Sequence, residues 1–240
     1  MRRQHDRHTK LQAWQRLLTT AVLLSHFLLS SFCQSLSQSE WRDSLRVLNS
    51  EIAAAGRQWN IDLHLRKAAV NMQLQQWQYA VDEYAGILER EPRNPAALFY
   101  RAYANTHLRR YVLARNDYHD LLAVFPRHFE ARLSLAYVLQ LMQKPREALD
   151  ELNQLVEHHP DSAVAYASRA NLERELQQNE AAVYDWQTAV TLSPMNADYV
   201  VSLAEVLIVL NRRREARRVL DAASKRGVPR GLLAEWYSRL

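Results

Sequence analysis

Glycine and cysteine are scarce in this sequence. Its 240 residues include four glycines, Gly56, Gly86, Gly227 and Gly231, which are not clustered as a phosphate-binding loop or a dinucleotide fingerprint requires. The single cysteine, Cys33, excludes an intrachain disulfide and a multi-cysteine zinc or iron–sulfur site. Packing must therefore supply the stability, and a chain of this length with 48% apolar residues can bury a sizeable core.

The first apolar run, residues 17–29, is too short to cross a bilayer comfortably, but its flanks have the form of an export signal. Five basic residues precede it: Arg2, Arg3, Arg7, Lys10 and Arg16. Small Ser31 and Cys33 then stand at the third and first positions before Gln34, which predicts cleavage between Cys33 and Gln34. We therefore expect residues 1–33 to be a signal peptide and the chain to be exported, to a periplasm, a cell envelope or the outside of the cell.

Two alternatives to cleavage stay open at the same segment. The leader could remain as an uncleaved anchor, or Cys33 could carry a lipid. Bulky Phe32 stands where lipoprotein signals have a small residue, which argues against the lipid. Either alternative would make the chain a structural protein of an envelope or membrane surface.

Charge is nearly balanced once the leader is set aside. Of the 31 Lys and Arg and 26 Asp and Glu residues, 26 and 25 respectively lie beyond residue 33, so we expect no nucleic-acid partner. Residues 211–240 are the exception, with nine basic and three acidic side chains. The densest part of this segment is a basic patch formed by Arg212, Arg213, Arg214, Arg217 and Arg218. It is interpreted either as a solvated helix face or as a docking site for an anionic protein or lipid surface.

The sequence repeats itself at a constant interval. Prolines recur at positions 92, 126, 160 and 194. Two alanine columns keep the same spacing, at 68, 102, 136, 170 and 204 and at 80, 114, 148, 182 and 216. Four positions after each alanine of the second column stands a large side chain: Tyr84, Tyr118, Leu152, Trp186 and Leu220. Several columns with one common spacing indicate an array of structural repeats.

These columns resemble the tetratricopeptide repeat, whose 34-residue pattern has a small residue, then Ala-x3-aromatic, then Pro. The resemblance covers residues 61–228 as five repeats, at 61–94, 95–128, 129–162, 163–196 and 197–228. It implies an all-α fold, a right-handed superhelical solenoid of antiparallel helix pairs. Alanine replaces the family's glycine, the early Trp and Leu columns are poorly kept, and Pro229 comes one residue late. Segments 34–60 and 229–240 are predicted to be the N-terminal and C-terminal capping helices.

The columns also have a direct physical explanation. In the second repeat we expect helices at about 95–108 and 112–125, joined by a polar turn at Arg109 and Arg110. Small Ala102 and Ala114 suit the closest approach of the two helices, because longer side chains would hold the axes apart. Pro126 then prevents the second helix from continuing.

No group of side chains predicts catalysis or metal binding. The acidic pairs Asp150 and Glu151, and Glu173 and Glu175, point to different sides of a helix and are interpreted as solvated. The histidines near the repeat prolines, His119, His128, His158 and His159, are expected at helix C-termini rather than in a metal site. We therefore expect no enzyme activity, no cofactor and no metal.

The resemblance places function on a concave groove lined mainly by the first helix of each repeat, with a protein, peptide or helix as the partner. The predicted groove residues are Phe99, Tyr100, Tyr103, His107, Tyr137, Asn171 and Arg174. Tyrosine offers rigid contact area with a hydrogen-bonding tip, which suits peptide recognition. The same rings could instead form the core between repeats, and the sequence leaves both interpretations open.

Overall fold

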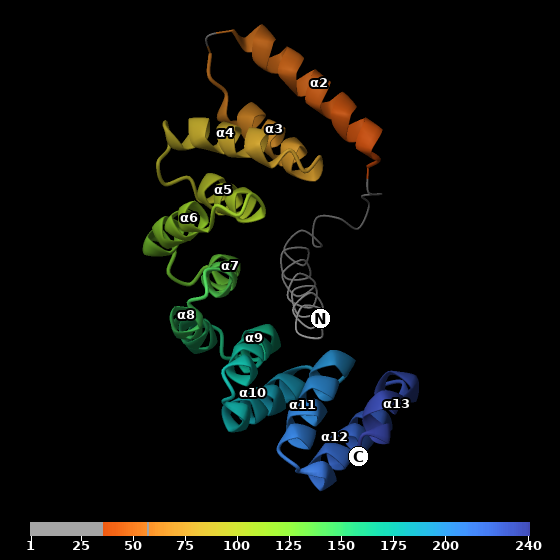
Figure 1. Cartoon of the computed structure of the whole chain (residues 1–240). Coiled ribbons are helices and arrows are strands. Elements are labelled where there is room, and N and C mark those ends of the chain that lie inside the picture. Colours follow the sequence, from red (N-terminus) through yellow and green to blue (C-terminus); the bar gives the residue numbers. More distant parts are fainter. Residues whose placement is uncertain (1–35, 57) are drawn as a thin grey trace, which may run out of the picture. The chain divides into compact units, whose positions relative to one another are not determined.

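The computed structural model describes residues 36–56 and 58–240, which form twelve helices in sequential antiparallel pairs (Figure 1). In the first half they are α2 (Gln38–Ala55), α3 (Ile61–Gln73), α4 (Trp77–Leu88), α5 (Pro95–His107), α6 (Tyr111–Val124) and α7 (Phe129–Leu141). The second half contains α8 (Pro145–His158), α9 (Ala163–Glu175), α10 (Asn179–Leu192), α11 (Ala197–Val209), α12 (Arg213–Arg226) and α13 (Arg230–Ser238). The predicted all-α fold is confirmed. The predicted signal peptide, its cleavage site and Cys33 lie outside the described residues.

The chain divides into two compact units, at Met142 and Gln143. Within the first unit each helix from α2 to α7 packs against the next. Within the second unit the same holds from α8 to α13, and α13 also contacts α11. Each of the five predicted repeat intervals contains one helix pair, from α3 and α4 to α11 and α12.

The first helix of every repeat begins at a capping residue that recurs with the repeat spacing: Asn60, Asn94, His128, Ser162 and Asn196. Each side chain accepts a hydrogen bond from a backbone N–H of the first helical turn, which satisfies a donor that the helix leaves unpaired. His128 was expected at a helix C-terminus, and that expectation is wrong. Its Nδ1 accepts from the N–H of Ala131, so it caps the start of α7.

In each repeat, the connection between the two helices contains a residue with a left-handed backbone conformation. Gln75, Arg109, Gln143, Gln177 and Asn211 have φ between 57° and 62°. In the α9–α10 connection, for example, the N–H of Gln178 donates to the carbonyl of Glu173 at 2.8 Å. This is the backbone pattern that closes many helices with a left-handed residue, most often glycine. Here a residue with a side chain takes that conformation in all five repeats.

The two alanine columns lie at the centre of the packing. All ten alanines have an exposed fraction of 0%. The large side chains that follow the second column, Tyr84, Tyr118, Leu152, Trp186 and Leu220, are at most 2% exposed. The burial of both columns is the pattern expected if small residues lie at the close approaches of the helices and large ones fill the wider gaps.

Ion pairs join the helices inside three of the repeats. Lys67 pairs with Glu83 at 2.7 Å, and Arg101 with Asp117 and Arg169 with Asp185 at 2.6 Å. The corresponding positions of the third and fifth repeats hold Leu135 with Glu151 and Leu203 with Val219. In each of these three repeats, another polar side chain follows the Lys or Arg by one helical turn. These side chains are at most 7% exposed: Asn71, Asn105 and Glu173. The prediction that Glu173 is solvated is therefore wrong.

Helices α2 and α13 pack on the outermost repeats of their units. Leu48 of α2 is buried with Val70 and Leu74 of the first repeat. Leu233 of α13 has an exposed fraction of 0% and joins the cluster of buried residues that includes Leu220. Both helices thus cover apolar side chains of the neighbouring repeat.

Candidate functional site

Five aromatic side chains of the first unit lie near one another, and together they are called the aromatic face: Trp77, Tyr103, His107, Tyr111 and Tyr137. The Trp77 and His107 rings stack with centroids 4.0 Å apart and planes 4° from parallel. Tyr103 lies 4.7 Å from His107 and 6.3 Å from Trp77, between ring centroids. Four successive helices, α4 to α7, contribute to the aromatic face.

The aromatic face carries little charge. Stacking removes water from the imidazole, and this desolvation lowers the pKa of His107, which keeps the ring neutral near pH 7. Partial burial raises the pKa of Tyr103 and of Tyr137, and the neighbouring Tyr111 and Tyr103 hydroxyls raise that of Tyr137 further. Tyr103 and Tyr137 are thus neutral phenols, whose hydroxyl groups can donate or accept a hydrogen bond.

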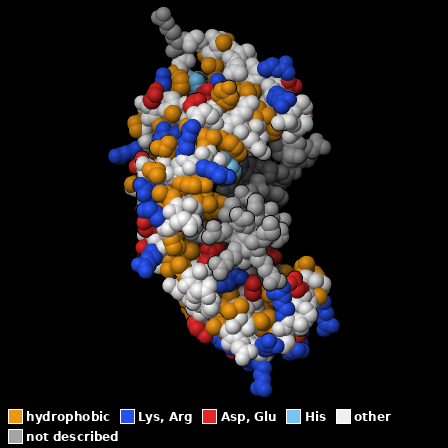
Figure 2. All heavy atoms as spheres, viewed as in Figure 1, with side chains coloured by type: hydrophobic (Ala, Val, Ile, Leu, Met, Phe, Trp, Pro, Cys, Tyr) orange, Lys and Arg blue, Asp and Glu red, His pale blue; other side chains and the backbone are white. Residues whose placement is uncertain are grey.

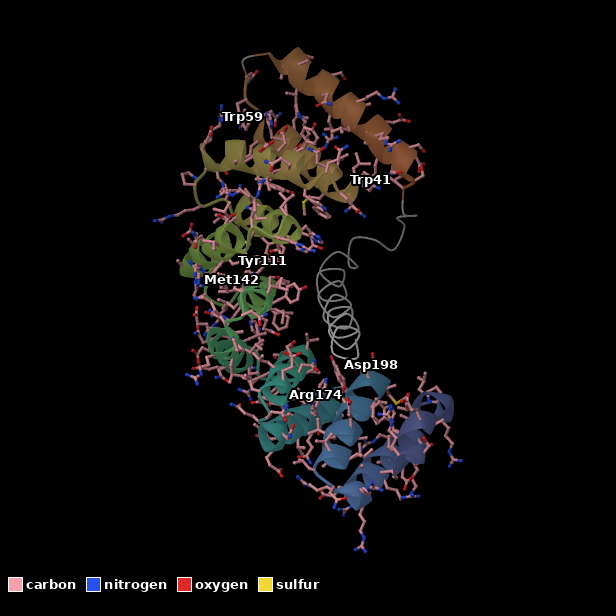
Figure 3. All side chains as sticks on the ribbon, viewed as in Figure 1. Trp41, Trp59, Tyr111, Met142, Arg174 and Asp198 are labelled. Atoms are coloured by element: carbon pink, nitrogen blue, oxygen red, sulfur yellow. The ribbon has the colours of Figure 1, made fainter. Side chains whose placement is uncertain are left out.

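The repeat register explains why these rings meet. Tyr103 and Tyr137 occupy the same position of consecutive first helices, and His107 follows Tyr103 by one turn. Trp77 and Tyr111 each begin a second helix and also hold equivalent positions of consecutive repeats; Tyr111 is labelled in Figure 3. The sequence analysis did not predict Trp77 and Tyr111, because it considered only the first helix of each repeat. Their separation by one repeat length could have indicated that they share a surface.

Two of the predicted groove residues belong to the core side of α5. Phe99 is 6% exposed, and its ring packs edge-on against Tyr118 at 5.8 Å and stacks on His128 at 5.7 Å. Tyr100 is half-buried and lies 6.0 Å from the buried ring of Tyr84. For Phe99 the core interpretation therefore applies, since a ligand could reach its ring only after repacking.

The remaining predicted groove residues lie in the second unit, on α9. Arg174 Nη1 donates to Glu205 Oε2 of α11 at 2.6 Å, so its guanidinium is already engaged (labelled in Figure 3). Asn171 is half-buried. The aromatic face is accordingly a feature of the first unit alone.

Two side chains of the basic patch make hydrogen bonds, and the other three are exposed on α12. Arg212 donates to both carboxylate oxygens of Glu215 and to Glu180 at 2.9 Å. Arg213 Nη1 donates to the carbonyl oxygen of Leu240 at 3.1 Å. Arg214, Arg217 and Arg218 are exposed on α12.

A cavity of about 320 Å³ opens where α2 ends and α3 begins. Trp59, labelled in Figure 3, lines it and stacks on His64 with ring centroids 3.6 Å apart. The Arg90 guanidinium lies 3.7 Å from the centre of the same Trp59 ring. These contacts fix the loop before α3 against the end of α4.

Within the described ranges 36–56 and 58–240, no helix has the length and apolar character needed to span a membrane. In the same part of the chain, no three His, Cys, Asp or Glu side chains are grouped so that they could hold a metal ion.

The fold and the repeated register define a helical-repeat protein built from pairs of antiparallel helices. Two family models described as tetratricopeptide repeat match residues 65–120 and 106–172. The chain is a tetratricopeptide repeat protein. Repeats of this family form scaffolds for protein–protein interaction, typically without enzymatic activity, which suggests protein or peptide partners.

Solved structures with the same fold include several repeat proteins of low sequence identity. A tetratricopeptide repeat protein from Parabacteroides merdae has a TM-score of 0.65 and 17% identity, covering 95% of this chain and 89% of that one. MamA from Desulfovibrio magneticus RS-1 has a TM-score of 0.61 and 21% identity, and the match covers 69% of this chain and 93% of MamA. YrrB, described as a TPR protein with an unusual peptide-binding site, has a TM-score of 0.60 and 16% identity. The match covers 80% of this chain and 97% of YrrB.

A curated relative is the DnaJ homolog subfamily C member 7 homolog of Dictyostelium discoideum. It is 22% identical over 182 residues, which cover 69% of this chain. The matched region spans only 33% of that relative's length.

Proposed function

We propose that this protein is an exported scaffold that binds a short segment of a partner protein on the aromatic face of its first unit. The observation that carries the proposal is the stack of Trp77 and His107 with Tyr103 beside it. Rigid rings with polar tips give large contact area at low entropic cost, as binding hot spots do. Their position on consecutive helices suits an extended or helical segment that crosses several repeats.

The chemistry of the aromatic face favours a neutral or apolar segment. No Lys, Arg, Asp or Glu occurs at positions 102–108 of α5 and its end, or at positions 133–142 of α7 and its end. Some members of the family bind a chain-terminal carboxylate through lysine and asparagine of the first helices. Leu65 and Ala69 hold the corresponding first-repeat positions, so this chain lacks those donors.

Support for export comes from the sequence of positions 1–33 alone, with its basic start and apolar run. The test is the N-terminal sequence of the protein isolated from its host. A chain that begins at Gln34 in the exported fraction supports the proposal. A chain that keeps its leader, or carries lipid on Cys33, favours the alternative of an anchored structural protein at a membrane surface.

The binding test is cross-linked capture from the native host with the wild-type chain and a variant carrying Tyr103→Ala and Tyr137→Ala. A matched control carries Tyr184→Ala, because Tyr184 is 66% exposed and belongs to the second unit, whereas the aromatic face belongs to the first. Circular dichroism and thermal unfolding would establish that all three are folded. We expect a partner that the wild type and the control retain and the double variant loses. Equal capture by all three would show that the aromatic face is not the binding site.

A further inference from the structure

A line of basic side chains runs along the exposed side of α12. Arg214, Arg218 and Lys225 follow at intervals of four and seven positions, which places them on one helix face, and Arg217 flanks them. All four are exposed. The opposite face is buried through Ala216, Leu220 and Ala223, each at most 1% exposed. These four side chains are called the basic stripe.

The basic stripe makes no close ion pair in the described part of the second unit, although Arg218 is near enough to Glu215 to lower the pKa of that carboxyl group. Other arginines of the second unit are held by carboxylates: Arg169 by Asp185, Arg174 by Glu205 and Arg212 by Glu215 and Glu180. Across residues 143–240 as described, no member of the basic stripe lies within ion-pair distance of an acidic group. Two acidic residues lie between Arg214 and Lys225 along the helix: Glu215, which accepts from Arg212, and Asp221, which accepts from the Tyr237 hydroxyl at 2.8 Å. Figure 2 shows Lys and Arg side chains projecting at this C-terminal end.

The neighbouring helix α13 adds apolar and basic groups. Leu232 is 59% exposed, and the half-buried Trp236 carries the Arg239 guanidinium 4.4 Å above its ring. Arg230 is exposed and donates to Ser224 of α12 at 3.2 Å. Exposed leucine next to tryptophan and arginine is the composition of protein surfaces that lie in the headgroup region of a bilayer.

We propose that the basic stripe and Leu232 form a docking surface for a membrane that contains anionic phospholipids. Arg214 and Lys225 are eleven positions apart, so the charges span about 16 Å along a straight helix. A line of this length on an outward helix face suits a planar array of phosphates better than it suits a single small anion. A guanidinium group can bind two phosphate oxygens at once, and Leu232, exposed on the neighbouring helix α13, supplies an apolar contact. The proposal is independent of the aromatic face, which lies in the other unit.

The first experiment is vesicle flotation of the full chain with phosphatidylcholine vesicles that contain or lack phosphatidylglycerol. The variant carries Arg214→Gln, Arg217→Gln, Arg218→Gln and Lys225→Gln. The control removes the same charge from exposed positions elsewhere, with Arg93→Gln, Arg109→Gln, Arg110→Gln and Arg146→Gln. All three proteins keep positions 1–33 unchanged, so any difference between them reports the substituted sites.

Each basic residue near an anionic surface contributes about fivefold to binding, so the stripe variant should lose about a hundredfold or more in partitioning. Binding of the wild type should weaken as sodium chloride is raised, because salt screens the attraction. Equal binding by the variant and the control would overturn the proposal. Stripe-dependent binding to soluble polyanions such as heparin, without binding to anionic vesicles, would overturn it as well.

A second measurement locates the contact. Cys33→Ser and Leu232→Cys place a single environment-sensitive label on α13, and Val47→Cys, at a position 54% exposed on α2, serves as the control site. The label at 232 should shift to the blue with anionic vesicles and not with neutral ones, while the label at 47 stays unchanged. The shift should disappear in the stripe variant. Bound protein whose label at 232 does not respond would show that another surface makes the contact.

Discussion

Arg101 of α5 donates two hydrogen bonds to the carboxylate of Asp117 of α6, from Nε at 2.9 Å and from Nη2 at 2.6 Å. The Asp117 residue is only 5% exposed. Two repeats later, Arg169 and Asp185 form the same paired arrangement, with distances of 2.6 and 2.8 Å. A charged pair therefore recurs at a position where the third and fifth repeats place Leu135 and Leu203 on the first helix.

The chain itself supplies an apolar template for replacing this pair. Asp117→Ala alone should lower the free energy of unfolding by about 3 kcal/mol, because it leaves the Arg101 guanidinium without its partner between two helices. Arg101→Leu combined with Asp117→Val copies Leu203 and Val219 of the fifth repeat and should recover most of that loss. Urea unfolding of the two variants and the wild type measures both effects. A double variant as unstable as Asp117→Ala would show that the helices here require the ion pair itself.

Glu173 makes stability depend on pH. Burial, and next the charge of Asp185, raise its pKa to about 7, while Arg169, 3.9 Å away, opposes the shift. In the unfolded chain a glutamate loses its proton near pH 4.5, so between these pH values the folded state holds a proton that the unfolded state has released. The free energy of unfolding should therefore fall as pH rises from about 4.5 to about 7 and level off above, by up to about 3 kcal/mol in total from this group.

Glu173→Asn provides the comparison, since Asn105 holds the same position beside the Arg101–Asp117 pair. The variant should gain stability relative to the wild type as pH rises from 5 to 8, as measured by urea unfolding at each pH. A constant difference between the two proteins over this range would mean that Glu173 does not change its protonation on unfolding.

The repeat columns and the polar interior differ in how far sequence alone predicts them. The roles of the repeated alanines and prolines were predictable, because few residue types fit where two helices approach closely and few end a helix. Lys67, Arg101 and Arg169 look like ordinary solvated helix residues, and their partners stand 16 positions further along the chain. Their pairing emerges only when two helices lie side by side.

The aromatic residues show a second limit to prediction from sequence, which is that a pattern does not say which rings are buried. Phe99 and Tyr103 are one helical turn apart, yet a small rotation of α5 decides which ring enters the core and which stays partly exposed. Trp77 belongs to the second helix of its repeat, whereas the predicted groove included only residues of the first helices. Pattern thus predicts the register of a repeat, while the neighbours of a given ring depend on how the helices pack.

The alanine columns predict intolerance to larger side chains. Ala102→Leu should destabilise the protein by about 1–3 kcal/mol, because Ala102 and Ala114 are both fully buried where α5 meets α6. Ala123→Leu, on the exposed side of α6, is the matched control and should change the free energy of unfolding by less than about 0.5 kcal/mol. Thermal and urea unfolding would compare the two. Equal stability of both variants would contradict the packing of these two helices.

The left-handed connections predict a gain in stability. Gln177 has φ 62°, where a side chain costs about 1 kcal/mol relative to glycine, so Gln177→Gly should stabilise the protein by about 0.5–1 kcal/mol. Asn211→Gly should gain less, because asparagine tolerates this conformation better than glutamine does. Gln187→Gly, at an exposed position inside α10, should instead destabilise by about 1 kcal/mol. Opposite signs for the same substitution at 177 and 187, measured by urea unfolding, would trace the effect to the backbone conformation, whereas a loss at both positions would contradict the strained turn.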